Sequence, residues 1–135
     1  MFRENIAADD AVELRNSVRG EIELIRARIS FLKGPEKLLM KMHLNDGYKI
    51  QEIACCAGVC ESTISRKIKK ISQRLTSPLF CAFFENKDMF NTFERKVIKD
   101  FLREGLTQRK ISEKRNTTRY YVRKAIEKLE TLVMV

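Results

Sequence analysis

The chain has 135 residues, with 27 Lys and Arg against 18 Asp and Glu, which gives a formal net charge of +9. Apolar residues make up 44% and charged residues 33%, typical of a helical globular protein, and the length allows one ordinary domain or two very small ones. Because the chain has few Gly and no long apolar run, we expect no Gly-rich phosphate loop, no transmembrane helix, no secretory signal and no membrane partner. We expect a cytoplasmic protein with reduced cysteines.

Residues 1–34 are predicted to form a long N-terminal helix. Along residues 9–33, apolar side chains recur at close to heptad spacing, with charged residues opposite them. The stripe consists of Ala11, Leu14, Val18, Ile22, Ile25, Ile29 and Leu32. It either packs against the chain's own neighbouring domain or pairs with a second copy in a homodimer, and the sequence leaves both interpretations open.

Residues 35–76 are predicted to form a domain of three helices. The first helix opens at Pro35 and ends at Asn45-Asp46-Gly47, with Leu38, Leu39, Met42 and Leu44 as its apolar stripe. The second helix spans 50–57 and the third 61–75, separated by a turn at Gly58. The side chains expected to be buried in these two helices are Ile53, Ala54, Ala57, Ile64, Ile68, Ile71 and Leu75. Two helices around a tight Gly turn indicate a helix-turn-helix.

Burial of the third helix's apolar stripe determines which side chains face outward. The free face begins with short polar groups, which can approach base edges, and continues with cations for phosphates and guanines. A solvated charged face is the plainer interpretation, but Glu61 is the one acid in this basic run. The outward residues are Glu61, Ser62, Ser65, Arg66, Lys69 and Lys70.

Two stretches carry a resemblance to a known family: Gly47-Tyr48-Lys49-Ile50-Gln51-Glu52-Ile53-Ala54, and Ala57-Gly58-Val59-Cys60-Glu61-Ser62-Thr63-Ile64-Ser65-Arg66-Lys67-Ile68. Together they resemble region four of bacterial sigma factors and the related DNA-binding domains of LuxR-type regulators. The resemblance implies promoter or operator contacts from Cys60, Glu61, Ser62, Ser65, Arg66 and Lys69. The chain departs from the family at Lys49 and Cys60, which stand where a Ser or Thr usually caps a helix. Nothing resembles sigma region two, so we expect no complete sigma factor.

Residues 77–92 are predicted to be an apolar linker helix, opened by Ser77 and Pro78. Aromatic residues at this density usually pack against neighbours, so the segment is expected to fix the two flanking domains relative to each other. A ligand pocket or a docking surface for RNA polymerase is the alternative. Asn91 and Glu94 are predicted to form a capping box at the start of the next domain.

Residues 93–135 are predicted to form a second helix-turn-helix domain, related to the first by a shift of 58 residues. In this register Gly47 falls on Gly105, and the turn residue Gly58 falls on Asn116, which also tolerates the left-handed conformation. Thr107 and Thr118 restore the two helix caps. The expected DNA-facing residues are Thr118, Arg119, Tyr120, Arg123, Lys124 and Lys128. The two copies either read different sequences, or one reads bases while the other holds the backbone.

The positive charge follows the same division. Residues 36–77 carry 8 basic and 4 acidic side chains, and residues 94–135 carry 12 and 6, so these blocks hold +4 and +6. Residues 1–35 are neutral and residues 78–93 carry 1 and 2, a net of −1. Two separated basic blocks indicate two contact regions on a polyanion.

Catalytic and metal-binding patterns are weak, so we expect no enzyme, no cofactor and no metal. The one histidine, His43, lies in an apolar stretch and is interpreted as a core or boundary residue. Cys55, Cys56 and Cys60 lack the paired spacing of a zinc site. Cys60 is interpreted as a small turn residue, with a redox-sensitive thiol as the alternative.

The sequence thus predicts an all-α protein with tandem helix-turn-helix units, winged-helix-like in general type, behind a long N-terminal helix. The expected function is sequence-specific binding of double-stranded DNA in transcription regulation. One alternative is a DNA-binding subunit of a recombinase or transposase. Another is a module that binds RNA polymerase and does not bind DNA alone.

Overall fold

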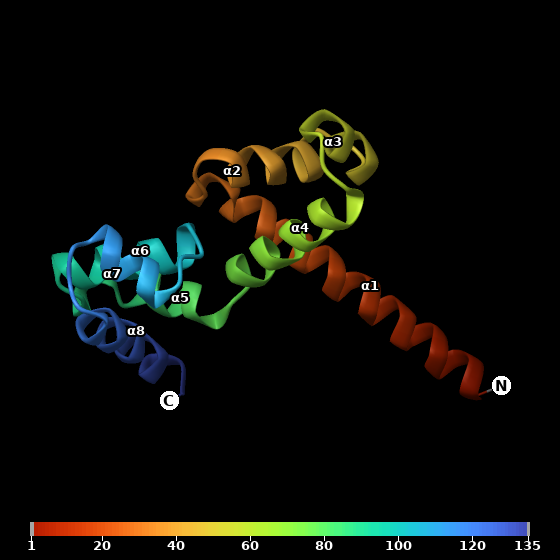
Figure 1. Cartoon of the computed structure of the whole chain (residues 1–135). Coiled ribbons are helices and arrows are strands. Elements are labelled where there is room, and N and C mark those ends of the chain that lie inside the picture. The colour runs from red at the N-terminus through yellow and green to blue at the C-terminus, as the bar shows by residue number, and fades with distance from the viewer. Residues whose placement is uncertain (1, 135) are drawn as a thin grey trace.

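The computed structural model describes residues 2–134, and it describes the side chains of residues 11–13 and 15–134. The protein is all-α, as predicted. No strand occurs in residues 2–134, so the winged-helix-like expectation is wrong, since a wing is a β-hairpin. The α-helices are α1 (Phe2–Arg28), α2 (Gly34–Met40), α3 (Ile50–Ala57), α4 (Glu61–Leu75), α5 (Pro78–Glu85), α6 (Thr92–Arg103), α7 (Gln108–Lys114) and α8 (Arg119–Met134) (Figure 1).

Helices α2–α4 and α6–α8 form two three-helix units with equivalent turns. In the first unit, the Tyr48 N–H donates to Met42 O, and the same bond joins Leu106 to Asp100, 58 residues later. Two further backbone bonds of the turn repeat in the same register. The N–H groups of Gly58 and Val59 donate to Cys55 O and Ala54 O, and 58 residues later those of Asn116 and Thr117 donate to Glu113 O and Ser112 O. Gly58 and Asn116 have φ of +69° and +51°, both left-handed. The turn geometry therefore repeats where the sequence shift places it.

The first unit buries most of the stripe that the sequence indicates, with two exceptions. Leu38 is 60% exposed. The next two residues of α2, Leu39 and Met40, face the core, and this orientation of the helix leaves Leu38 at the edge of the core. Ala57 is exposed at the last turn of α3. After α2 the chain continues through a π-helical turn, Lys41–Asn45, which holds Met42 and Leu44 half-buried. The expectations that Leu38 and Ala57 are buried are wrong.

Helix α5 joins the two cores. Phe80 belongs to the cluster of the first unit, and Phe83 belongs to the cluster formed with α6 and α8. Phe31 packs edge-on against Phe80 and Phe84, at centroid distances of 5.0 and 5.4 Å. Ser77 caps α5 by accepting a hydrogen bond from the Leu79 N–H. The segment 77–92 thus fixes one unit against the other, as expected, through α5 and a 3₁₀ turn, Lys87–Met89.

Two arginines hold α6 against the first unit, Arg74 from α4 and Arg103 from α6 itself. Arg74 Nη2 lies 2.7 Å from Glu36 Oε1, and the same guanidinium donates to Leu102 O and Arg103 O at the end of α6. Arg103 donates to Phe31 O at 2.8 Å and lies over the Phe31 ring. These bonds satisfy helix-terminal carbonyls that would otherwise lack partners.

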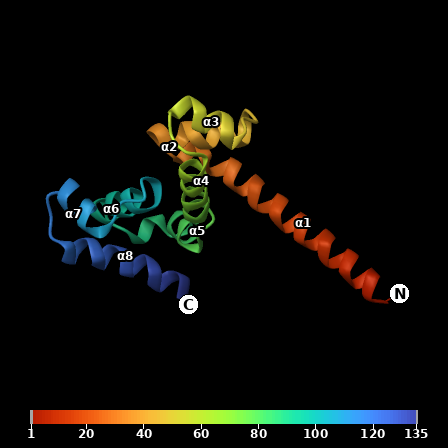
Figure 2. The same ribbon diagram turned by 45° about the vertical axis from the view of Figure 1, so that its right-hand side comes forward.

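Helix α1 is longer than the predicted stripe, since it begins at Phe2, and among its described side chains those buried in a core lie at its C-terminal end. Ile25 and Ile29 are buried in the first core, followed by Leu32, whereas Val18 is 48% exposed. The remainder extends away from the molecule in two views (Figures 1 and 2). Packing on its own domain is therefore confirmed for the end of the stripe, while Leu14 lies outside the described side chains.

Candidate nucleic-acid interface

The turn before α4 sets the direction in which α4 projects. Neither Lys49 nor Cys60 caps its helix with a side chain, and Glu52 compensates in part by accepting from the Lys49 N–H at 3.3 Å. Ile64, Ile71 and Leu75 hold α4 in the core. The opposite face is solvent-exposed along its whole length and presents Cys60, Glu61, Ser62, Ser65, Arg66 and Lys69.

The second unit presents a different chemistry at the equivalent place. Thr118 directly precedes α8, and the outward residues of its first two turns are exposed: Arg119, Tyr120, Arg123 and Lys124. Arg123 and Lys124 lie 5.9 and 5.5 Å from the centroid of the Tyr120 ring, and both are within 4 Å of the Glu127 carboxylate. Cation–π contacts of this kind pre-position cations at an exposed surface.

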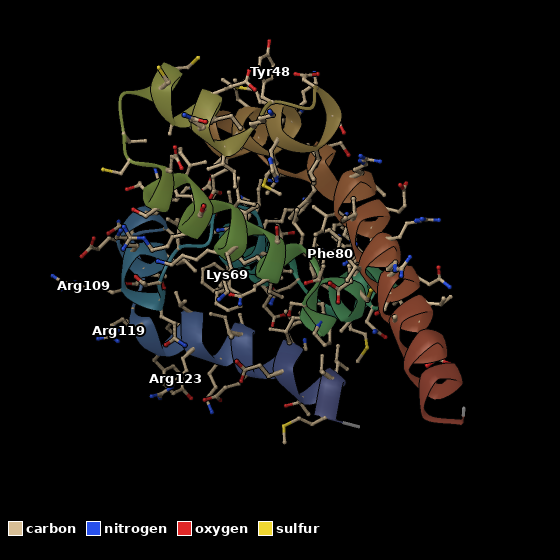
Figure 3. The ribbon with its side chains drawn as sticks, turned by 90° about the vertical axis from the view of Figure 1, so that its right-hand side faces the viewer. Tyr48, Lys69, Phe80, Arg109, Arg119 and Arg123 are labelled. Atoms are coloured by element: carbon tan, nitrogen blue, oxygen red, sulfur yellow. The ribbon has the colours of Figure 1, made fainter. Side chains whose placement is uncertain are left out.

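A shallow hollow of about 350 Å³ lies at the N-terminal end of α8, lined by Gln108, Arg119, Tyr120 and Arg123. Figure 3 shows Arg109, Arg119 and Arg123 projecting to the same side of the molecule. Gln108 and Arg109 of α7 lie outside the set of DNA-facing residues predicted from the sequence, which in this unit comprised Thr118 and residues of α8. Their signal was available, since they follow the Thr107 cap, whose hydroxyl accepts from the Lys110 N–H at 3.3 Å.

Two lysines predicted to face DNA take part in further features of the fold. Lys70 lies one turn after Arg66 on α4, is exposed, and also lines two hollows beside that helix. Lys128 Nζ donates to Met89 O at 2.7 Å, pairs with Glu94 at 3.2 Å and lies over the Phe90 ring, so it anchors α8 to the linker. Both side chains remain exposed.

A buried carboxylate stabilises the second unit. Asp100 is 3% exposed and accepts from Arg115 Nε at 2.7 Å and from Lys114 Nζ at 3.0 Å. Burial by itself would raise the pKa of the Asp100 carboxyl, but the hydrogen bonds from Arg115 and Lys114 outweigh it, so that pKa lies below its ordinary value. The cluster links α6 to the end of α7 and holds the turn before α8.

The features examined for catalysis or metal binding stay isolated in the structure. Within the described residues, no three His, Cys, Asp or Glu side chains gather where they could hold a metal ion. The four cysteines are exposed free thiols, including Cys60. His43 is half-buried and its Nδ1 has no hydrogen-bond partner, which agrees with a boundary position.

No protein-family model, curated protein or solved structure matches this chain. Over residues 2–134, none of the helices combines the length and apolar character needed to cross a bilayer. The resemblance to sigma region four therefore stands on the quoted residues alone.

Proposed function

We propose that the protein binds double-stranded DNA sequence-specifically and acts as a cytoplasmic transcription regulator of the sigma-region-four-like type. One observation carries the proposal. Two helix-turn-helix units with matching turns each leave the outward face of their last helix free, and both faces carry cations. An α-helix fits into the major groove of DNA, and the residues at its N-terminal end then contact base edges.

The two faces suit different contacts. On α4, Ser62 and Ser65 are short and precede Arg66 and Lys69, an order that lets the backbone approach bases while the cations meet phosphates. On α8, Arg119 and Arg123 flank Tyr120 in the shallow hollow, where guanidinium groups can pair with guanine or phosphate. We therefore assign base contacts to both helices, with the stronger electrostatic share on α8.

The arrangement of the units is compatible with a single duplex. In Figure 3 the N-terminal ends of α4 and α8 lie toward the same side, and in Figure 1 they are separated along the molecule, α4 starting beside α3 and α8 beside α7. The arginine bonds at the junction and the shared packing of α5 hold this arrangement fixed. A fixed pair of units favours two half-sites at a defined spacing, of the order of one helical turn, about 34 Å.

The test is selection of binding sites from random duplex DNA, followed by fluorescence anisotropy at several salt concentrations. The logarithm of the affinity should fall linearly with the logarithm of salt, because released counterions drive phosphate binding. Arg66→Ala and Arg123→Ala should each weaken binding roughly 5- to 100-fold. The matched control is Lys37→Ala, an exposed lysine of α2 outside both faces, which should leave the affinity unchanged.

Two outcomes would contradict the proposal. Absence of salt-dependent binding would leave the module that contacts RNA polymerase as the better interpretation. Full affinity in Arg66→Ala and Arg123→Ala would show that the two helix faces are not the interface. Selected sites that resemble the ends of mobile elements would instead favour the recombinase or transposase alternative.

A further inference from the structure

A large apolar groove opens on the first unit, with one wall formed by α4. It encloses about 620 Å³ and lies among α2, α3 and α4, bounded at one end by Glu104 and Gly105 of the second unit. Its apolar lining includes Leu38, Leu39, Met42, Cys56, Ile64 and Ile71. Concave, mainly apolar pockets of a few hundred Å³ are common places for ligands and partners to bind.

The second unit shows that the fold does not require this groove. At the positions 58 residues later, Met42 is replaced by Asp100, Cys56 by Lys114 and Ala57 by Arg115. These three charged side chains form the buried ion cluster that links α6 to α7. At the rim, Leu38 is replaced by Lys96. In the second unit, paired charged groups therefore stand at sequence positions that line the apolar groove in the first.

The charges around the open groove favour an acidic occupant. Its two acids are already paired, Glu36 with Arg74 at 2.7 Å and Glu104 with Lys114 at 2.9 Å. The lysines of its α4 wall, Lys67 and Lys70, form no ion pair among the described side chains. An occupant that brings apolar side chains and carboxylates would satisfy both the lining and the rim.

The free part of α1 has this composition. Residues 2–22 contain three Arg and five Asp or Glu, a net side-chain charge of −2. On the apolar stripe of this part, Val18 is 48% exposed, and Ala11 and Ile22 are half-buried. Residues 2–22 would span about 30 Å as a helix, and they extend clear of the body (Figures 1 and 2). Each chain thus offers this arm as well as the groove.

We propose that the arm formed by residues 2–22 of α1 docks in the first-unit groove of a second copy. Reciprocal exchange uses both arms and both grooves, so the assembly closes as a two-fold dimer and leaves no groove open for a further copy. The binding mode is an amphipathic helix in an apolar groove, with carboxylates of the arm facing Lys67 and Lys70. Direct pairing of two α1 helices would leave the grooves empty.

A cross-linking experiment tests the dock, because Cys56 already lines the groove. In full-length protein carrying Cys55→Ser, Cys60→Ser and Cys81→Ser, we would add Ala11→Cys or Val18→Cys on the arm. Air oxidation joins two thiols only when their Cα atoms lie within about 7 Å. We expect a covalent dimer on non-reducing gels from at least one variant, and its loss when Cys56→Ser is added. Asn16→Cys, on the opposite side of α1, is the control and should give less covalent dimer.

The outcomes separate the two modes of pairing. A covalent dimer that persists with Cys56→Ser shows that two arms contact each other, and this overturns the proposal. Absence of any Cys56-dependent dimer from both arm variants also overturns it.

Sedimentation of the full chain without DNA gives an independent measurement. Leu38→Lys installs the residue of the second unit at the groove rim and should weaken dimerisation at least tenfold, whereas Lys96→Ala should not change it. Lys67→Glu with Lys70→Glu should weaken dimerisation, and adding Asp10→Lys with Glu13→Lys should restore it. Unchanged association in Leu38→Lys, or no restoration, contradicts the dock. Because no DNA is present, failure here leaves the proposed function unaffected.

Discussion

The two helix-turn-helix units have equivalent backbone turns but different contents between their helices. The first unit leaves an apolar groove lined by Met42 and Cys56, and at the corresponding positions the second has the ion-paired Asp100 and Lys114, next to Arg115. The turn is maintained in both cases, so its geometry depends on backbone hydrogen bonds and left-handed residues more than on one kind of filling. The difference frees the first unit for contacts that the second cannot make.

The largest difference between the units is expected at the paired glycines that follow their first helices. Gly47→Ala should cost about 1–2 kcal/mol, because φ is +74° but the space around its Cβ is open. Gly105→Ala has the same conformational penalty at φ +66°, and its Cβ would also lie 2.8 Å from Arg74 Cζ. Displacing Arg74 breaks its bonds to Glu36 and Leu102, so the total should reach about 3 kcal/mol.

Urea denaturation of both variants measures this difference. Equal losses of unfolding free energy in Gly47→Ala and Gly105→Ala would show that Arg74 moves aside without consequence. In that case the junction would not depend on the arginine bonds described above.

The buried ion cluster of the second unit gives the next effect. Asp100→Asn removes the charge that pairs with Lys114 and Arg115, and should destabilise the protein by about 2 kcal/mol. This is less than the roughly 3–5 kcal/mol for a fully buried pair, because both cations retain contact with water. The triple change Asp100→Met, Lys114→Cys and Arg115→Ala installs the first unit's residues and should cost less than Asp100→Asn alone. A larger loss in the triple variant would contradict the equivalence of the two fillings.

The same cluster makes stability depend on pH in the acid range. The pKa of Asp100 is lower in the folded protein than in the unfolded chain, so the unfolded chain binds the proton more readily. The stabilisation is therefore present above the ordinary Asp pKa of about 3.9 and is lost as the pH falls through the lower folded value. The difference in unfolding free energy between the native protein and Asp100→Asn should shrink below about pH 4. A difference that stays constant down to pH 2 would contradict this assignment.

The smallest effect should come from the helix caps. Thr107→Ala removes the cap of α7 and should cost about 1 kcal/mol, whereas Lys49→Thr, at the equivalent place in the first unit, should gain up to about that amount. Thermal unfolding of the two variants measures opposite shifts. A loss in Lys49→Thr would mean that the Glu52 contact to the Lys49 N–H already suffices.

Features with a local cause could be predicted from the sequence. The helices 50–57 and 61–75, the left-handed Asn116 and the Asn91–Glu94 capping box depend on spacing, turn residues and neighbours within four positions. The outward faces of α4 and α8 followed from the apolar stripes opposite them.

Features that depend on distant partners could not be predicted. Arg74 bonds to Glu36, 38 residues away, and to Leu102, 28 residues away, and no periodicity carries that information. Lys128 was predicted to belong to a basic helix face, but its ammonium group donates a hydrogen bond to the backbone carbonyl of Met89 in the linker. The burial of Asp100 had one indication in the sequence, because the 58-residue shift aligns Asp100 with Met42, a residue of the apolar stripe of its helix.

The position of α5 determines how the molecule comes apart. Phe80 lies in one core and Phe83, one turn later, lies in the other. Unfolding either unit exposes one side of this short helix, and a helix of eight residues does not persist on one face alone. We therefore expect the two units to melt in a single cooperative transition, so that a destabilising substitution in one lowers the melting temperature of both.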